Sequence, residues 1–280
     1  MTSAPSSILI YGCGKMGEAI LSGWLASDEG PAASLGPGSF TLVERTAERR
    51  DSLAQDYGVQ VVGELDPTTT ADVVVLAVKP QSFPEVLPII RDAILANGTT
   101  PPLIVSIAAG IPTATIEQEL GSDVHVVRVM PNLPLQVGAG ATVVSAGAQA
   151  TDADVALVRD LFAALGEAHV VDEDQIDAVC AISGGGPAYF ASMIEMMRDA
   201  GVKAGLDANL AESLAQMTLY GTGLVLQETD QDAATLRQAV CSPGGTTLAA
   251  LSAMEAHGIR DAVEAGIDGA IARAEELSTC

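Results

Sequence analysis

The sequence predicts an α/β domain with a mainly parallel sheet, followed by a domain built only of helices. From residue 7 to about residue 171, short β-branched or apolar runs alternate with segments of helical periodicity, which is the pattern of repeated βαβ units. After residue 173 the strand signals stop and one helical segment follows another. A length of 280 residues suits two domains. We therefore expect domains that span residues 1–172 and 173–280.

The individual elements follow from these patterns. Strands are expected at 7–11, 40–43, 59–62, 72–78, 102–108, 124–130, 141–147 and 168–172. Helices between them are expected at 15–27, 46–57, 84–97 and 152–165. Thr151 and Asp152 indicate the start of the last of these helices, because Thr and Asp are favoured at the start of a helix. The helices of the second domain are expected at 174–182, 186–204, 208–228, 232–240, 246–257 and 260–277.

One helical segment of the second domain has an unusual surface. Residues 209–227 carry apolar or small side chains almost all round, which is more than one core-facing stripe needs. A helix of this kind is buried on several sides, most simply in a subunit interface. The sequence thus predicts self-association of the chain.

Charge and composition exclude several classes of partner. The net charge of −23 repels nucleic acid and anionic membrane surfaces at long range, so neither is an expected partner. The first residues lack the features of a signal peptide, and no apolar run approaches the ~20 residues that span a bilayer. The four cysteines form no CxxC pair and the three histidines are scattered, so we expect reduced thiols, no metal site and a cytoplasmic protein.

The segment "GCGKMG" forms a glycine-rich turn between the first strand and the first helix. Gly12, Gly14 and Gly17 have the G-x-G-x-x-G spacing, which at this place in a βαβ series indicates a doubly wound, Rossmann-type dinucleotide-binding domain. The glycines allow a tight turn, close approach of the pyrophosphate and close helix–sheet packing. A purely structural glycine turn is the alternative. The expected cofactor contacts are Gly12, Cys13, Gly14, Lys15, Met16 and Gly17.

Residues after the second strand bear on the choice of cofactor. Glu44 could accept hydrogen bonds from a free ribose 2′-hydroxyl, which favours NAD(H). Arg45 and Thr46, with Arg49, could hold a 2′-phosphate, which favours NADP(H), although the arginines could also form a solvated helix face. NADP(H) is the preferred expectation because Arg45 and Thr46 follow the strand directly, and NAD(H) stays open.

Further candidates lie where other strands end, at the carboxyl edge where ligands bind in this architecture. Small residues in "VSIAAGI" would let a flat ring approach the backbone, and tight packing is the alternative reading. The expected contacts are Ala77, Val78, Lys79, Pro80, Ala108, Ala109 and Asn132.

A second glycine-rich turn, "VCSPGGTTLAAL", leads into another predicted helix. Pro243 stiffens it, and Gly244 and Gly245 remove Cβ atoms, so the N–H groups of Gly245, Thr246 and Thr247 can converge on an anion. The first turn already serves the cofactor phosphates, so this turn is free for a different anion. The alternative for Thr247 is a plain helix-capping residue.

Six segments together resemble the pyrroline-5-carboxylate reductase family. They are "GCGKMGEAI", "AVKP", "SIAAG", "VMPN", "ISGGGPAYF" and "VCSPGGTT", in the family's order and across nearly the whole chain. The resemblance implies a nucleotide domain, a helical dimerisation domain, and NAD(P)H-dependent reduction of 1-pyrroline-5-carboxylate to L-proline in proline biosynthesis. It also implies a dimer, with a decamer as the larger assembly. Two positions depart from the family pattern: Gly185 replaces a common Ser, and Ala239 replaces an Asn that can contact the cofactor.

The resemblance also implies roles for individual residues. Val78, Lys79 and Pro80 would lie along the nicotinamide, with Ala108 and Ala109 near its carboxamide. The expected substrate contacts are Ser242, Gly244, Gly245, Thr246 and Thr247. Thr247 would hydrogen-bond the ring nitrogen and Glu173 would orient the ring or stabilise its charge, which makes these two the expected catalytic residues.

Three rival functions are less well supported. A β-hydroxyacid dehydrogenase would need a helix Lys after a glycine-rich turn, and no Lys or Arg lies between Ser183 and Arg198. A hydrolase would need a G-x-S-x-G elbow, which "ISGGG" lacks. A cofactor sensor would bind nucleotide without turnover, and the intact SPGGTT turn argues against it.

Overall fold

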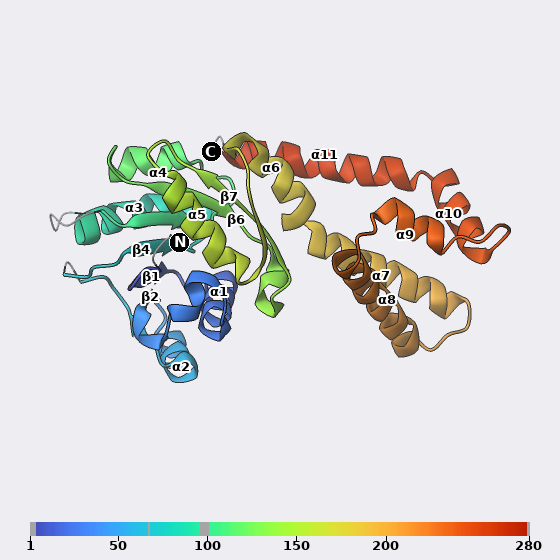
Figure 1. The fold of residues 1–280 in the computed structure, drawn as a ribbon, viewed down its shortest axis with the longest axis horizontal. Helices are drawn as coiled ribbons and strands as arrows, with labels where there is room; N and C mark the ends of the chain where they lie inside the picture. The colour runs from blue at the N-terminus through green and yellow to red at the C-terminus, as the bar shows by residue number, and fades with distance from the viewer. Residues whose placement is uncertain (1–3, 67, 96–100, 279–280) are drawn as a thin grey trace. The chain divides into compact units, whose positions relative to one another are not determined.

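The structure, a computed structural model, describes residues 4–66, 68–95 and 101–278. The chain forms two compact units, which are Met1–Gly185 with Ala270–Cys280, and Gly186–Gly269 (Figure 1). The first unit holds the sheet, and the second holds only helices. The domain boundary expected after residue 172 stays a prediction.

An eight-stranded sheet with the order β3-β2-β1-β4-β5-β6-β7-β8 forms the first unit. Its strands are β1 (Ile8–Tyr11), β2 (Phe40–Val43), β3 (Gln60–Val62), β4 (Val73–Leu76), β5 (Leu103–Ser106), β6 (Val126–Met130), β7 (Gly140–Ala146) and β8 (Gly166–Val170). All neighbours are parallel except β6 and β7. Each expected strand is present, and the predicted α/β class is confirmed. Because β1, β2, β4, β5 and β6 run in one direction, their carboxyl ends meet at one edge of the sheet.

Helices cover both faces of the sheet (Figure 1). α1 (Lys15–Ala26), α2 (Ala47–Tyr57) and α5 (Asp152–Ala163) bury apolar residues against one face. α3 (Phe83–Ile90) and α4 (Thr113–Leu120) do so against the other. This two-sided covering explains why the central strands are apolar at every position rather than alternating.

Three segments differ from the helices expected from the sequence. α4 was not expected at all. The helix expected at 84–97 is α3 followed by a π-helical turn, η4 (Arg91–Leu95), and residues 96 and 97 lie outside the described residues. The helix expected at 174–182 consists of a 3-10 turn η6 (Glu173–Gln175), a short α6 (Ile176–Val179) and a π-helical turn η7 (Cys180–Gly184). Between α1 and β2 the chain forms two 3-10 turns, η1 (Gly30–Ser34) and η2 (Pro37–Ser39).

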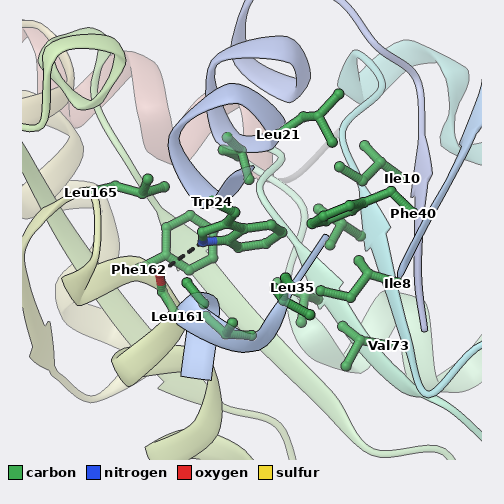
Figure 2. Packing of buried hydrophobic residues seen from close by; sticks show 14 of the residues in the cluster. Ile8, Ile10, Leu21, Trp24, Leu35, Phe40, Val73, Leu161, Phe162 and Leu165 are labelled. Carbon is green, nitrogen blue, oxygen red and sulfur yellow. Dashed lines mark hydrogen bonds between the residues drawn. The ribbon is translucent and has the colours of Figure 1, made fainter. Parts of the chain in front are cut away.

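Trp24 organises the core on the α1 side of the sheet, as Figure 2 shows. Its ring stacks on Phe40 with a centroid distance of 6.3 Å, and it meets Phe162 edge-on at 5.5 Å. Its Nε1 donates to the backbone oxygen of Leu161 at 2.7 Å, so the buried indole N–H is satisfied. α1 and α5 are thereby joined.

The second unit contains α7 (Gly186–Lys203), α8 (Ala208–Glu228), α9 (Ala233–Ala239), α10 (Thr246–Ala256) and the first part of α11 (Ile259–Ser278). α7 and α8 pack together through small residues, since a Cβ on Gly201 would lie 3.1 Å from the Cβ of Ala211. Much of the apolar surface of this unit stays exposed. Among the described residues, no helix is both long and apolar enough to cross a membrane.

Candidate active site

The three glycines of the first turn are required for three different reasons. Gly12 has a φ of 90°, and a Cβ there would lie 2.6 Å from Cγ1 of Val78. A Cβ on Gly17 would lie 2.6 Å from the backbone oxygen of Gly12, so only glycine lets α1 approach the turn. Gly14 is exposed, and no described atom lies within 4 Å of the position its Cβ would take. The middle glycine therefore borders open space, as a close approach of pyrophosphate requires.

The residues between these glycines present backbone rather than side chains at this turn. α1 begins at Lys15, and within the described residues no side chain caps its first amides. The Cys13 side chain is fully buried in the core, and burial, with a contribution from the Glu18 carboxylate, raises the pKa of its thiol to about 12. Met16 also packs against the core, whereas Lys15 is exposed. The turn therefore offers free amides at the positive end of a helix, which suits a phosphate.

The segment after β2 has its acidic residue engaged with the backbone. Oε1 of Glu44 accepts the N–H of Thr46 at 3.0 Å, directly before α2 begins. Arg50 donates to the backbone oxygens of Glu44 and Arg45 at 3.2 and 2.7 Å, and Arg49 pairs with Glu18. Arg45 is the cation of this segment that extends into solvent, with its side chain 78% exposed.

Residues after β4 and β5 lie beside the first turn. The N–H of Ala77 donates to the backbone oxygen of Tyr11 at 2.9 Å, and Val78 is the neighbour that Gly12 would meet. Lys79 is exposed and precedes a 3-10 turn, η3 (Pro80–Ser82). Ala108 is buried and Ala109 half-buried beyond β5. The structure thus brings the ends of β1, β4 and β5 together.

Asn132 and Glu173 also belong to the first unit, but their side chains are occupied. Oδ1 of Asn132 accepts the N–H of Ala141 at 2.9 Å, and its Nδ2 donates to the backbone oxygen of Ser183 at 3.1 Å. Asn132 precedes a 3-10 turn, η5 (Leu133–Val137). The Glu173 carboxylate accepts hydrogen bonds from Thr113 and Arg128. Both residues therefore hold parts of the protein together.

The second glycine-rich turn lies in the helical unit. The N–H of Gly245 donates to the backbone oxygen of Ser242 at 2.9 Å, and Gly244 has a φ of 72°. This is a tight turn with glycine where a positive φ is needed. α10 begins at Thr246, and in the described part of the chain no side chain caps it. The free amides are therefore those of Thr246, Thr247 and Leu248. The Gly245 amide, which the sequence predicts to bind an anion, instead closes the turn.

Comparison with known proteins matches both parts of the chain. Residues 173–277 match the family model for pyrroline-5-carboxylate reductase dimerisation, and residues 7–110 match the model for NADP oxidoreductase, coenzyme F420-dependent. The pyrroline-5-carboxylate reductase of Mycobacterium leprae is 37% identical over 99% of this chain and 98% of its own length. This chain belongs to the pyrroline-5-carboxylate reductase family. The family recognised from the six motifs is thereby confirmed.

Relatives and solved structures extend this result. The pyrroline-5-carboxylate reductase of Synechocystis is 37% identical over 96% of this chain and 97% of its own length. The solved pyrroline-5-carboxylate reductase of Coxiella burnetii has a TM-score of 0.87 and 34% identity, and covers 98% of both chains. The Plasmodium falciparum pyrroline carboxylate reductase, solved with NADP bound, has a TM-score of 0.82 and 26% identity, over 97% of this chain and 98% of its own. The predicted class, an NAD(P)H-dependent oxidoreductase, is confirmed.

Sequence reasoning missed three groups that the structure shows at or beside the predicted site residues. The Leu248 amide is a backbone group, so no motif pointed to it. Arg128 could have been noticed in the sequence, because it is a charged residue inside an otherwise apolar strand. Ser183 accepts a hydrogen bond from Asn132 through its backbone oxygen, and no sequence motif indicates such a backbone contact. Among the described residues no group of three or more His, Cys, Asp and Glu side chains could hold a metal ion.

Proposed function

We propose that this chain reduces 1-pyrroline-5-carboxylate to L-proline with a hydride from NADPH, or from NADH as the second donor. The predicted activity is that of the family to which the chain belongs. One observation carries the proposal at the level of residues. In the described part of the chain, α1 and α10 each follow a glycine-rich turn and begin without a side-chain cap, the first beside the sheet edge and the second at SPGGTT.

The first of these turns fits a dinucleotide. Open space beside Gly14 and the free amides at the start of α1 would accommodate the pyrophosphate. Glu44, Arg45 and Thr46 would face the adenosine ribose. The nicotinamide, which supplies the hydride when bound, would lie along the strand ends that carry Ala77, Val78, Lys79, Pro80, Ala108 and Ala109. Asn132 would support this edge through Ala141 and Ser183 rather than by a side-chain contact with the cofactor.

The second turn fits the carboxylate of the imine acid. The amides of Thr246, Thr247 and Leu248 lie at the positive end of α10, where an anion is favoured. Ser242, Gly244 and Gly245 shape the turn by their own hydrogen bond and positive φ. In a chain of net charge −23, local amide donors can hold an anion that the overall field would repel.

The chemistry needs little from acidic or basic side chains. A protonated cyclic imine is already electrophilic, so a strong protein acid is not required. Holding donor and acceptor in a productive geometry can lower the barrier by up to ~7–11 kcal/mol. Thr247 would place its hydroxyl at the ring nitrogen. Glu173, the second expected catalytic residue, has its carboxylate engaged by Thr113 and Arg128. His125, His169 and His257 are hydrogen-bonded to Asp154, Glu167 and the Ala253 backbone oxygen, respectively.

The helical region, with the dimerisation match over residues 173–277, supports a dimer. Leu210, Leu214 and Met217 follow the i, i+4, i+7 spacing of one face of α8, and all three are exposed. A stable monomer rarely exposes so continuous an apolar face. We propose a dimer formed through residues 173–280, with residues 1–172 as the nucleotide domain, and a decamer as the larger assembly. A cytoplasmic location is part of the proposal, because Cys13, Cys180 and Cys241 are free thiols.

A cofactor-consumption assay tests the activity. Purified protein is mixed with 1-pyrroline-5-carboxylate and either NADPH or NADH, and the loss of absorbance of the reduced cofactor is followed. We expect turnover with NADPH and formation of proline in equal amount. Binding of NADPH without turnover would instead support the cofactor-sensing alternative and refute the proposed activity.

A further inference from the structure

Arg128 is a buried charge with no role in the reaction proposed above. It is 4% exposed and lies on β6, where its register partners are Ser106 on β5 and Ser145 on β7. Paired residues share a face of the sheet, so these two small side chains leave room for the guanidinium. Nη1 donates to Oε1 of Glu173 at 3.2 Å. Nη2 lies 4.0 Å from Oδ1 of Asp177 and has no hydrogen-bond partner among the described residues.

Glu173 connects this strand to a helix on the same side of the sheet. Its Oε1 also accepts the N–H of Thr113 at 2.8 Å, and its Oε2 accepts the Thr113 hydroxyl at 2.7 Å. Thr113 is buried and is the first residue of α4, so the carboxylate lies at the positive end of that helix. Three hydrogen bonds, one of them from a charged donor, fix its orientation.

A second attachment lies at the other end of the same stretch of chain. We call residues 173–184, which comprise η6, α6 and η7, the linker segment. Arg128 holds its first residue, and Asn132 holds it near the end through the backbone oxygen of Ser183. Both holding side chains come from β6 and the two residues that follow it. β6 and the chain directly after it thus fix the path of the linker segment at two points.

The linker segment ends in an unusual conformation that benefits from such support. η7 (Cys180–Gly184) is a π-helical turn, closed by a bond from the N–H of Gly185 to the backbone oxygen of Cys180 at 3.0 Å. π-helical turns are rare and are frequent at functional sites. Gly185 is also the last residue of the first unit in this stretch of chain. The two attachments therefore fix where the chain leaves the nucleotide-binding unit.

We propose that Arg128 and Glu173 are positioning residues that fasten the linker segment to β6. A buried ion pair is a weak source of stability compared with apolar packing, so a specific geometry is the better reason to keep one on a core strand. Glu173 then acts through Arg128 and Thr113 and does not contact the imine acid. The inference rests on the proposed function, because a displaced linker segment matters for turnover only if the chain is a reductase.

A double-mutant cycle tests this pair in the full-length protein. We expect Arg128→Met and Glu173→Gln each to lower kcat by roughly 10- to 100-fold, since a small misplacement of reacting groups has effects of that size. The dissociation constant for NADPH should stay unchanged. The double variant should be no slower than the slower single variant, because both changes break one contact. Amide hydrogen exchange of residues 176–184 should accelerate in all three.

Arg159→Met is the matched control, because Arg159 pairs with Asp160 on the exposed side of α5. It should leave both kcat and hydrogen exchange at wild-type values. If Arg128→Met does not fold, Arg128→Lys keeps the charge and should show an intermediate kcat and intermediate exchange. Wild-type values in the lysine variant and in Glu173→Gln would overturn the proposal.

Two other results would also overturn it. In the first, Glu173→Gln raises the KM for the imine acid while Arg128→Met keeps wild-type kinetics. That result would mean that Glu173 contacts the substrate directly. In the second, the losses of kcat in the two single variants add up fully in the double variant. Absence of turnover in the wild-type protein would refute the proposed function instead, and the hydrogen-exchange comparison would still decide whether the pair holds the linker segment.

Discussion

The backbone oxygen of Ser242 accepts the N–H of Gly245 at 2.9 Å. This bond closes the turn that precedes α10 and uses an amide that could otherwise have bound an anion. The amides that remain for the proposed carboxylate site are therefore those of Thr246, Thr247 and Leu248, one residue further along the chain than the sequence predicts. Gly245 therefore shapes the turn and does not itself bind the anion. A substitution of Gly245 should act by distorting the turn.

Gly245→Val should raise the KM for the imine acid by roughly 10- to 100-fold, the effect of losing one charged hydrogen bond. A Cβ at this position would lie 3.1 Å from the Ser242 backbone oxygen and would also meet the Ser242 hydroxyl, so the turn must distort. NADPH affinity should be nearly unchanged. Thr247→Val, which keeps the shape and removes the hydroxyl, should mainly lower kcat. Steady-state kinetics with each reactant varied in turn measure both effects. A Gly245→Val variant with damaged cofactor binding and a normal KM for the imine acid would refute the assignment.

Gly14→Val should weaken NADPH binding severely without unfolding the protein. Its backbone is extended, with φ −69° and ψ −172°, and no described atom lies within 4 Å of the added Cβ. The side chain would occupy the space of the pyrophosphate. Gly36→Val is the matched control, because Gly36 is also extended, with φ −118° and ψ 176°, and also has no described neighbour within 4 Å. Fluorescence titration with NADPH should separate the two variants, and equal affinities would argue against the first turn as the cofactor site.

Glu44→Gln should increase the preference for NADPH over NADH. The glutamine oxygen can still accept the Thr46 N–H, so the turn before α2 is kept while the negative charge is removed. Removing a half-buried like charge beside a 2′-phosphate should change the ratio of the two kcat/KM values by roughly fivefold, or about 1 kcal/mol. The substitution should change this ratio less at high salt, because salt screens the charge. A selective loss of activity with NADPH would show that Glu44 faces away from the adenosine ribose.

Met217→Glu should disrupt the dimer, because a charge would enter the exposed apolar face of α8. Met217 is 66% exposed in the single chain and shares that face with Leu210 and Leu214. Gln216→Glu adds the same charge at an exposed position about 100° round the helix from Met217, away from that face, and serves as the control. Light scattering at micromolar concentration should give at least a dimer for the wild type and a smaller species for Met217→Glu. A monodisperse wild-type monomer would rule out the dimer.

Asp72 should contribute to acid stability. The Ser6 hydroxyl and the amides of Ser6 and Ser7 donate to its carboxylate, and these hydrogen bonds outweigh burial and hold its pKa below the usual value. A lowered pKa stabilises the folded state above the unfolded value of about 3.9, and this contribution is lost as the pH falls through the folded pKa. Thermal unfolding at fixed protein concentration should show Asp72→Asn less stable than wild type at pH 7. The two should converge as the pH falls below the folded-state pKa of Asp72, and a gap that persists there would contradict the assignment.

The sequence predicted the strands well because they are short β-branched or apolar runs that alternate with helical segments. It missed α4, since "TATIEQEL" is one short segment with only Ile116 and Leu120 as buried apolar residues. It could not foresee the π-helical turns η4 and η7, because π turns have no periodicity that differs clearly from an α-helix. Such turns are set by tertiary contacts, as the bond from Asn132 to Ser183 illustrates.

The candidate site was predictable where glycine is required by geometry and less so where side chains have several uses. Gly12, Gly14 and Gly17 form the expected turn, and the structure adds a separate reason for each. Asn132 lies at a strand end as the sequence predicts, and its side-chain amide bonds Ala141 and Ser183, which no motif indicates. Distances between residues 45 or 60 positions apart, such as Arg128 or Thr113 to Glu173, do not follow from one sequence.

The contact between Trp24 and Leu161 has a consequence for how the protein is made. The two residues are 137 positions apart, so the indole stays without its hydrogen-bond partner until most of the first unit has left the ribosome. Contacts of such long sequence separation slow folding, and an incomplete chain exposes its apolar faces in the meantime. Trp24 is also the sole tryptophan of the chain, so its emission during synthesis or refolding would register the moment at which the first helix and α5 come together.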